Sequence, residues 1–201
     1  ERIERADRVI RYKSAKYSVE HPLLIGATTG GLDDAGVEAL SRYGLDLGRA
    51  FQLRDDLLGV FGDPQETGKP AGDDLREGKR TVLLAHALAG LDAGGQARVE
   101  SLVGRADLDA SQVEELRATI VGSGAVARLE DEITRLADAA TSALGDATSI
   151  GDEARAALLD LVGKPIGISR LGSLNHQAST FALRHQGVDP ASVQFLAIAG
   201  S

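Results

Sequence analysis

The chain has 201 residues, of which 43% are hydrophobic and 3% aromatic, and its formal net charge is -8. This length supports one sizeable core, and the acidic balance argues against nucleic acid as a partner because nucleic-acid binders carry basic patches. The lack of cysteine excludes disulfides and thiolate metal sites. No apolar run approaches the roughly 18 residues of a membrane span, so we expect no stable membrane anchor and a cytoplasmic location.

Small aliphatic residues dominate the hydrophobic fraction, which favours an all-α fold because close-packed helices accept them more readily than sheets do. The first predicted helix spans residues 2–29, and Pro22 within it predicts a kink or a break near residues 18–22. Its inward stripe is predicted at Ile3, Ala6, Val9, Ile10, Ser14, Tyr17, His21 and Leu24.

A second helix is predicted over residues 34–61, after the Gly30-Gly31 pair and with Asp33 or Asp34 as its cap. Its apolar side is predicted at Val37, Leu40, Leu47, Phe51, Leu58 and Phe61. Residues 62–79 are rich in Gly, Pro, Asp and Lys, which favours a loop. Further helices are predicted over residues 81–91, 110–121, 124–145 and 152–162. The composition then changes, so residues 1–164 are predicted as one helical domain and residues 165–201 as a poorly specified, mobile tail.

The densest group of chemically capable side chains lies near the end of the second predicted helix. Helical spacing places Gln52, Asp55 and Gly59 in one stripe, with Asp56 beside it. Two adjacent carboxylates repel each other unless a cation or water lies between them. Oxygen ligands of this kind suit magnesium, although the pair taken alone also fits a solvated acidic face.

Basic residues flank this group in the sequence. The loop contains Gly68-Lys69 and Gly78-Lys79, where glycines let the backbone turn and lysines supply charge for phosphate oxygens. It is not a nucleotide P-loop, because Arg80 follows Gly78-Lys79 where that motif requires Ser or Thr. The first helix adds Lys13 beside Ser14, and a lysine so placed also fits a solvent-directed side chain.

Together these segments resemble the trans-type prenyl diphosphate synthase family. The resemblance lies in Lys13-Ser14, Phe51-Gln52-x-x-Asp55-Asp56, Gly68-Lys69 and Asp74-Leu75-x-x-Gly78-Lys79-Arg80-Thr81. It implies an antiparallel helix bundle of the isoprenoid synthase type. The family's first aspartate-rich motif would lie upstream of Lys13, so we expect the bundle to be incomplete at its N-terminus and the chain to be inactive alone. Gly59 stands where the family's second motif has its third acid.

The resemblance also implies an activity, in which isopentenyl diphosphate condenses with an allylic prenyl diphosphate and diphosphate is released. It assigns Asp55 and Asp56 to Mg²⁺. It assigns Lys13, Lys69 and Lys79 to substrate diphosphate, with Lys13, Ser14 and Gln52 as catalytic residues. We further expect a homodimer, and we expect Asp55 and Lys69 to lie on one wall of a polar cavity.

Two other classes stay open at this point. A non-catalytic subunit of a synthase complex would keep the helical scaffold, but it has no need of lysines facing acids across a cavity. A terpene cyclase of related fold would ionise similar substrates without chain elongation, but residues 68–81 resemble those of the elongating synthases.

Overall fold

A computed structural model of the chain describes residues 1–62, 70, 72–145 and 147–163, and the tail predicted over residues 165–201 lies outside them. The described part is helical and contains no strand, which confirms the predicted all-α class. None of its helices has both the length and the apolar character needed to cross a membrane. The elements are α1 (Arg2–Val9), η1 (Ile10–Glu20), α2 (His21–Thr29), α3 (Asp34–Phe61), α5 (Asp73–Glu77), α6 (Val82–Ala89), α7 (Ala93–Leu102), α8 (Ala110–Gly122), α9 (Ala125–Gly145) and α10 (Asp152–Gly163).

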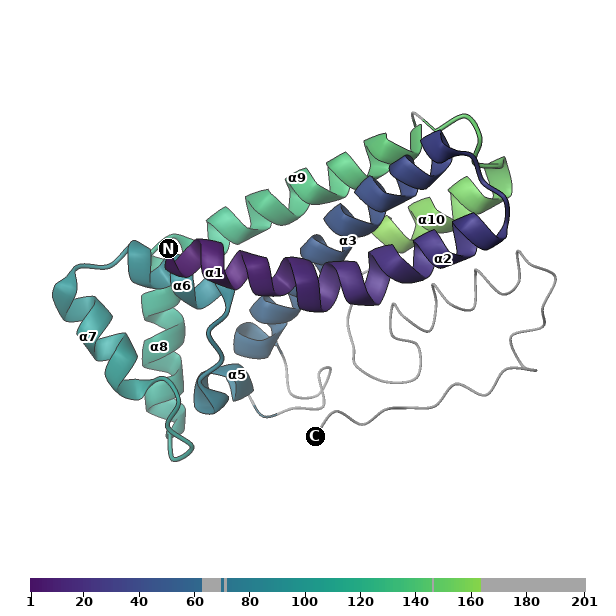
Figure 1. Cartoon of the computed structure of the whole chain (residues 1–201). Coiled ribbons are helices and arrows are strands. Elements are labelled where there is room, and N and C mark those ends of the chain that lie inside the picture. The colour runs from purple at the N-terminus through teal and green to yellow at the C-terminus, as the bar shows by residue number, and fades with distance from the viewer. Residues whose placement is uncertain (63–69, 71, 146, 164–201) are drawn as a thin grey trace.

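The first three elements form one continuous helical rod (Figure 1). Of the kink or break predicted near Pro22, the break is absent, because the π-helical stretch η1 continues directly into α2. The N–H of His21 bonds to the carbonyl of Lys16, five residues earlier, as a π-helix requires. Pro22 lies in the first turn of α2, where a missing backbone donor is tolerated.

The wider turn of η1 changes which residues of the rod face inward. The predicted stripe is wrong at Val9 and Tyr17, which are 55% and 70% exposed, and at His21, which is also exposed. Ala15, Val19 and Leu23 are buried in their place. A stripe based on α-helical spacing fails here because π-type hydrogen bonds add a residue to each turn.

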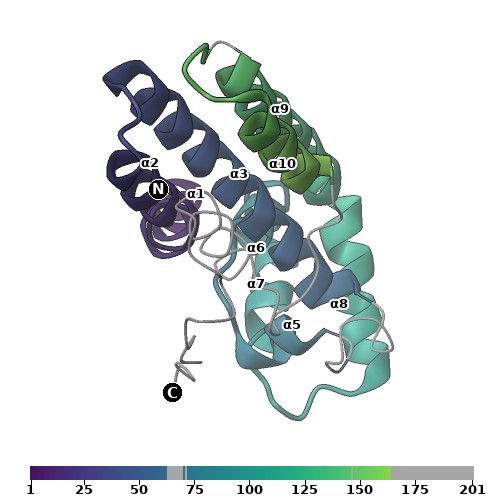
Figure 2. The same ribbon diagram turned by 90° about the vertical axis from the view of Figure 1, so that its right-hand side faces the viewer.

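Helix α3 matches the bounds predicted for the second helix, and it runs between the first rod and the pair α9–α10 (Figure 2). Asp33 caps it by accepting a hydrogen bond from the N–H of Gly36 at 2.8 Å. Of its predicted apolar side, Leu40 and Leu47 are buried, and the other four residues are only half-buried. The single-face prediction fails because several elements enclose α3 on different sides.

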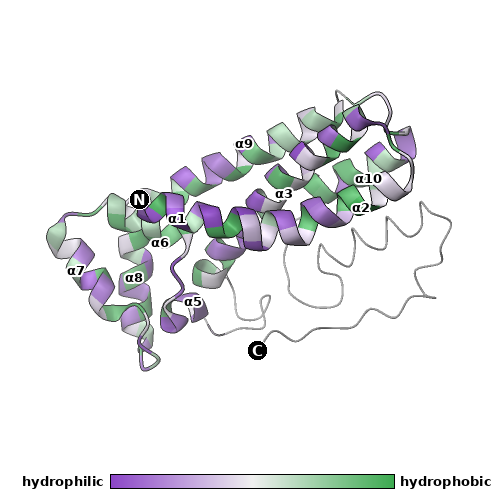
Figure 3. Cartoon of the chain, in the orientation of Figure 1, coloured by the Kyte–Doolittle hydropathy of each residue, from purple (hydrophilic) through white to green (hydrophobic). Residues whose placement is uncertain are grey.

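The remaining elements follow the prediction with two exceptions. The predicted loop contains the short helix α5, which is mostly hydrophilic (Figure 3). Helix α7 was not predicted, because it begins with Ala-Gly-Gly and buries only Val99 and Leu102. The helices predicted over residues 110–121, 124–145 and 152–162 are confirmed to within one residue at each end.

Two apolar clusters form the core. One joins the C-terminal half of α3 to α6, α7, α8 and the first half of α9. The other joins the N-terminal half of α3 to η1, α2, α10 and the last turns of α9. In this second cluster the hydroxyl of Tyr43 donates to the carbonyl of Leu158 at 2.7 Å and ties α10 to α3.

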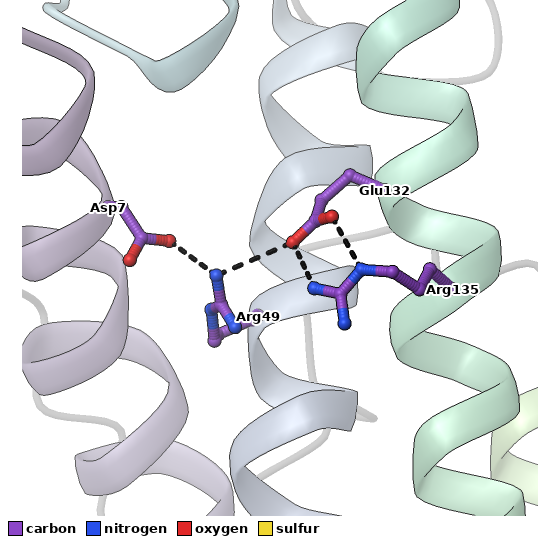
Figure 4. A network of polar contacts seen from close by, with 4 residues as sticks. All are labelled: Asp7, Arg49, Glu132 and Arg135. Carbon is purple, nitrogen blue, oxygen red and sulfur yellow. Dashed lines mark hydrogen bonds and ion pairs between the residues drawn. The ribbon is translucent and has the colours of Figure 1, made fainter.

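Charged residues link α3 to α1 on one side and to α9 on the other (Figure 4). Arg49 on α3 contacts Asp7 on α1 at 2.8 Å and Glu132 on α9 at 3.5 Å, and Glu132 also accepts from Arg135. These partly exposed pairs fix the register of three helices, although each contributes only about 1 kcal/mol or less to stability.

Candidate active site

A cavity of about 360 Å³ opens between the first rod, the C-terminal half of α3 and the segment that joins α5 to α6. The structure brings most of the predicted site residues together around it. Its lining comprises Ala6, Val9, Ile10, Lys13, Ser14, Gln52, Asp55, Asp56, Asp74, Lys79, Arg80, Thr81 and Val82. Lys69 lies outside the described residues, so the expected sharing of one wall by Lys69 and Asp55 stays a prediction.

The close approach of η1 to α3 positions the residues of the first rod. A Cβ atom on Gly48 would lie 2.6 Å from the Cα of Ala15, so only glycine permits this spacing. Just beyond that contact, the hydroxyl of Ser14 donates to Oε1 of Gln52 at 2.7 Å. The packing of η1 on a glycine of α3 therefore brings the Lys13-Ser14 pair to the cavity.

Gln52 organises the two acids of α3. Its Nε2 group donates to Oδ2 of Asp55 and to Oδ1 of Asp56, both at 3.1 Å. Asp55 is half-buried, whereas Asp56 is only 5% exposed. Burial raises the pKa of Asp56 to about 7. The hydrogen bond from Gln52 lowers this pKa, whereas the negative charges of Asp55 and Asp74 raise it.

One oxygen of Asp56 has no partner. Oδ2 is buried without a hydrogen bond. A buried carboxylate oxygen in this state is energetically unfavourable unless a cation or an ordered water satisfies it. The backbone N–H of Val82 lies close enough to this carboxyl group to lower its pKa, and Asp56 lines the cavity, so its carboxylate is available to a cation there.

Lys79 lies at the other side of the cavity, after the turn that ends α5. Gly78 adopts a left-handed conformation with a φ of 70°, which redirects the chain toward the site. The ammonium group pairs with Oδ1 of Asp74 and lies 3.1 Å from Oε2 of Glu77. Burial would lower the pKa of Lys79, but its hydrogen bonds to Asp74 and Glu77 raise it above the usual range, so the side chain is positively charged.

Sequence reasoning gave the acids of residues 68–81 only a shared role, to hold metal-bound water or orient the lysines, and did not single out Asp74. It is 5% exposed, lines the cavity and forms an ion pair with Lys79, whose side chain is 42% exposed. Asp74 lies five residues before Lys79, and this is not the spacing of three or four residues that predicts a contact on one helix face. The burial of the carboxylate becomes visible only after α5 has packed on α3.

The donor set fits a magnesium ion that takes part of its coordination from a ligand. In the described part of the chain, no three His, Cys, Asp or Glu side chains converge closely enough to hold a metal on their own. Asp55 and Asp56 nevertheless offer carboxylate oxygens at the cavity, one of them without a partner. Magnesium is commonly held by one or two carboxylates together with phosphate oxygens and water.

The chain is similar to known proteins in sequence and in fold. The chain is similar to a crystal structure of geranylgeranyl pyrophosphate synthase from Corynebacterium glutamicum complexed with isoprenyl diphosphate and magnesium. The TM-score is 0.77 at 43% identity, over 81% of this chain and 46% of the other. It is 40% identical to geranylgeranyl diphosphate synthase of Mycobacterium tuberculosis over 131 residues, which are 64% of this chain and 37% of that protein.

A third relative, from Methanocaldococcus jannaschii, extends the similarity to the archaea. It is a short chain isoprenyl diphosphate synthase, 36% identical over 91 residues, which are 45% of this chain and 28% of that protein. The chain thus spans less than half the length of each of these relatives. The model of the polyprenyl synthetase family matches residues 2–120, more than half of the chain. The helices, the cavity and this match lead to one conclusion: the chain belongs to the polyprenyl synthetase family.

Proposed function

We propose that this chain carries one side of the active site of a magnesium-dependent prenyltransferase. The reaction joins isopentenyl diphosphate to an allylic prenyl diphosphate, lengthens the isoprenoid chain and releases diphosphate. The observation that carries the proposal is the meeting of Lys13, Gln52, Asp55 and Lys79 around one cavity, although three different segments supply them. Lys69 and assembly as a homodimer are parts of the same proposal.

The lysines bind the diphosphate of the allylic substrate. Lys13, on the first rod, and Lys79, on the segment after α5, both line the cavity, and ammonium groups form strong charge-assisted hydrogen bonds to phosphate oxygens. Negative charge accumulates on those oxygens as the bond between carbon and oxygen breaks, so fixed positive charge stabilises the transition state more than the bound substrate. Magnesium held by Asp55 and Asp56 would supply further positive charge to the same oxygens.

Ser14 and Gln52 have distinct roles in this proposal. The hydroxyl of Ser14 uses its hydrogen on Gln52, which leaves its oxygen lone pairs free to face the allylic cation. The amide group of Gln52 is engaged with both acids, so this residue orients the carboxylates. The hydrogen-bond chain from Ser14 to Asp55 and Asp56 keeps the cation-facing oxygen and the metal-facing oxygens in a fixed relation.

An assay on the full-length protein tests the proposal. Labelled isopentenyl diphosphate is supplied with geranyl or farnesyl diphosphate, and the products are separated by chain length. We expect elongated prenyl diphosphates with magnesium, none with a chelator, and recovery when magnesium is restored. Elongation that continues in the chelator, or release of diphosphate from the allylic substrate alone without any elongation, would contradict the proposed reaction.

A further inference from the structure

Gly59 and Asp74 occupy one space between them. A Cβ atom on Gly59 would lie 2.1 Å from Oδ2 and 2.4 Å from Cγ of Asp74, distances at which atoms overlap. The carboxylate of Asp74 therefore fills the volume that any side chain at position 59 would take. The space beside Gly59 on α3 is thus occupied by the side chain of Asp74, which belongs to α5.

This arrangement fixes Lys79. The Asp74 carboxylate contacts Gly59 through one oxygen and the Lys79 ammonium through the other. The N–H of Lys79 also bonds to the carbonyl of Asp74 at 3.0 Å, so the two residues are joined by main chain and side chain. Glu77, whose side chain is 53% exposed, offers Lys79 an alternative partner toward solvent at 3.1 Å.

We infer that Asp74 is a positioning residue that holds the Lys79 ammonium at the cavity, and that Gly59 is the complement that makes room for it. The inference deepens the proposed function and rests on it for the identity of the ligand, a diphosphate. Without the Asp74 charge, Lys79 turns to Glu77 and leaves the cavity. A side chain at position 59 has the same effect, because it displaces the Asp74 carboxylate.

The holding of Lys79 is tested without any ligand. Lysine residues are labelled with an amine-reactive reagent at pH 9, and the rate at each lysine is measured by peptide mass spectrometry. Only the neutral amine reacts, so Lys79 should label slowly in the wild-type protein. Asp74→Asn keeps the side-chain shape but removes the charge, and it should raise the Lys79 rate about tenfold, as expected for a pKa lower by one unit.

Two controls accompany this measurement. Lys16, which pairs with Glu20 on η1, is an internal reference whose rate should stay constant in every variant. Glu77→Gln removes the exposed partner of Lys79 and should change its rate by no more than about twofold. Gly59→Ala should reproduce the effect of Asp74→Asn, and circular dichroism checks that each variant is folded.

A binding measurement then tests the purpose of the pairing. The affinity for inorganic diphosphate in the presence of magnesium should fall about tenfold in Asp74→Asn. The same substitution should have less than about a twofold effect in a Lys79→Met background, because Asp74 acts through Lys79. A purely structural role would lower affinity equally in both backgrounds, and that result overturns the inference.

The outcomes separate this inference from the proposed function. If Asp74→Asn leaves the labelling of Lys79 at the wild-type rate, Asp74 does not hold the lysine and the inference is wrong, whatever the protein binds. If labelling changes as expected but the wild-type protein binds no diphosphate with magnesium, the pairing stands and the proposed function is wrong.

Discussion

The N-terminal and C-terminal halves of α3 lie in different environments. The N-terminal half lies in an apolar cluster in which Tyr43 is fully buried and its hydroxyl finds a partner in the carbonyl of Leu158. The C-terminal half buries Asp56, one oxygen of which has no partner. An unpartnered buried oxygen also lies against the N-terminal half, at Oε2 of Glu20, so the two halves differ mainly in the residues that they present: apolar side chains and Tyr43 in one, and Gln52, Asp55 and Asp56 at the cavity in the other. We therefore expect the N-terminal half to contribute mainly to stability and the C-terminal half to carry the proposed chemistry.

Asp55→Ala tests the chemical half and should have the largest effect. Turnover of the full-length protein should fall by about a thousandfold or more, because lost stabilisation of the departing diphosphate is worth roughly several kcal/mol. The free energy of unfolding should change by about 1 kcal/mol or less, since Asp55 is half-buried and the substitution removes its hydrogen bond from Gln52. Enzyme kinetics and thermal unfolding measure the two effects. Wild-type turnover in this variant would show that Asp55 does not bind a metal that the reaction needs.

Leu47→Ala tests the apolar half and should show the reverse pattern. Leu47 is 1% exposed in the second cluster, so its truncation should lower the free energy of unfolding by about 2–5 kcal/mol. Affinity for diphosphate with magnesium should stay near the wild-type value in the folded fraction. Denaturant titration and calorimetry decide the matter, and a large loss of affinity at unchanged stability would contradict the division of α3.

Gly48→Ala tests the boundary between the halves, where η1 rests on α3. The added methyl group meets the Cα of Ala15, and we expect a loss of about 1–3 kcal/mol in stability together with weaker diphosphate binding. Gly122→Ala is the matched control, because that helical glycine has open space around it. The control should be neutral or stabilising by up to about 1 kcal/mol, as alanine favours helix over glycine. Equal effects of the two substitutions would show that the contact is not tight.

Tyr43→Phe should have the smallest effect. It removes the hydroxyl that bonds to Leu158 and leaves a buried carbonyl without that donor, which reduces stability by about 1 kcal/mol. The distance of Tyr43 along α3 from the acids predicts unchanged turnover. A variant that unfolds like the wild type but turns over more slowly would place Tyr43 in the chemical half.

The sequence was sufficient for most of the fold because its boundaries are local signals. Asp33 and Gly30-Gly31 define the start of α3, and Asp109 with Gln112 forms a capping box at α8. Helix α7 was missed because two glycines and few apolar residues weaken its pattern. The π-helical stretch was missed since a single sequence gives no direct sign of a change in turn size.

The candidate site divides in the same way. Gln52 and Asp55 lie close together on one helix, so their shared face could be predicted from spacing. The contact of Ser14 with Gln52 spans 38 positions, and the resemblance to a family assigned both residues to the site without predicting that they touch. The packing of Asp74 into the space at Gly59 depends on the docking of α5, a tertiary contact that neither spacing nor propensity encodes.

The most direct test of the account is a crystal structure of the protein grown with manganese and diphosphate, in which manganese substitutes for magnesium and is located by its anomalous signal. We predict a metal peak in the cavity next to Asp55, with the diphosphate between that metal and Lys79. A diphosphate bound elsewhere, or a metal that leaves Asp55 and Asp56 without contact, would contradict the central claim that the C-terminal half of α3 is the chemical half of this helix.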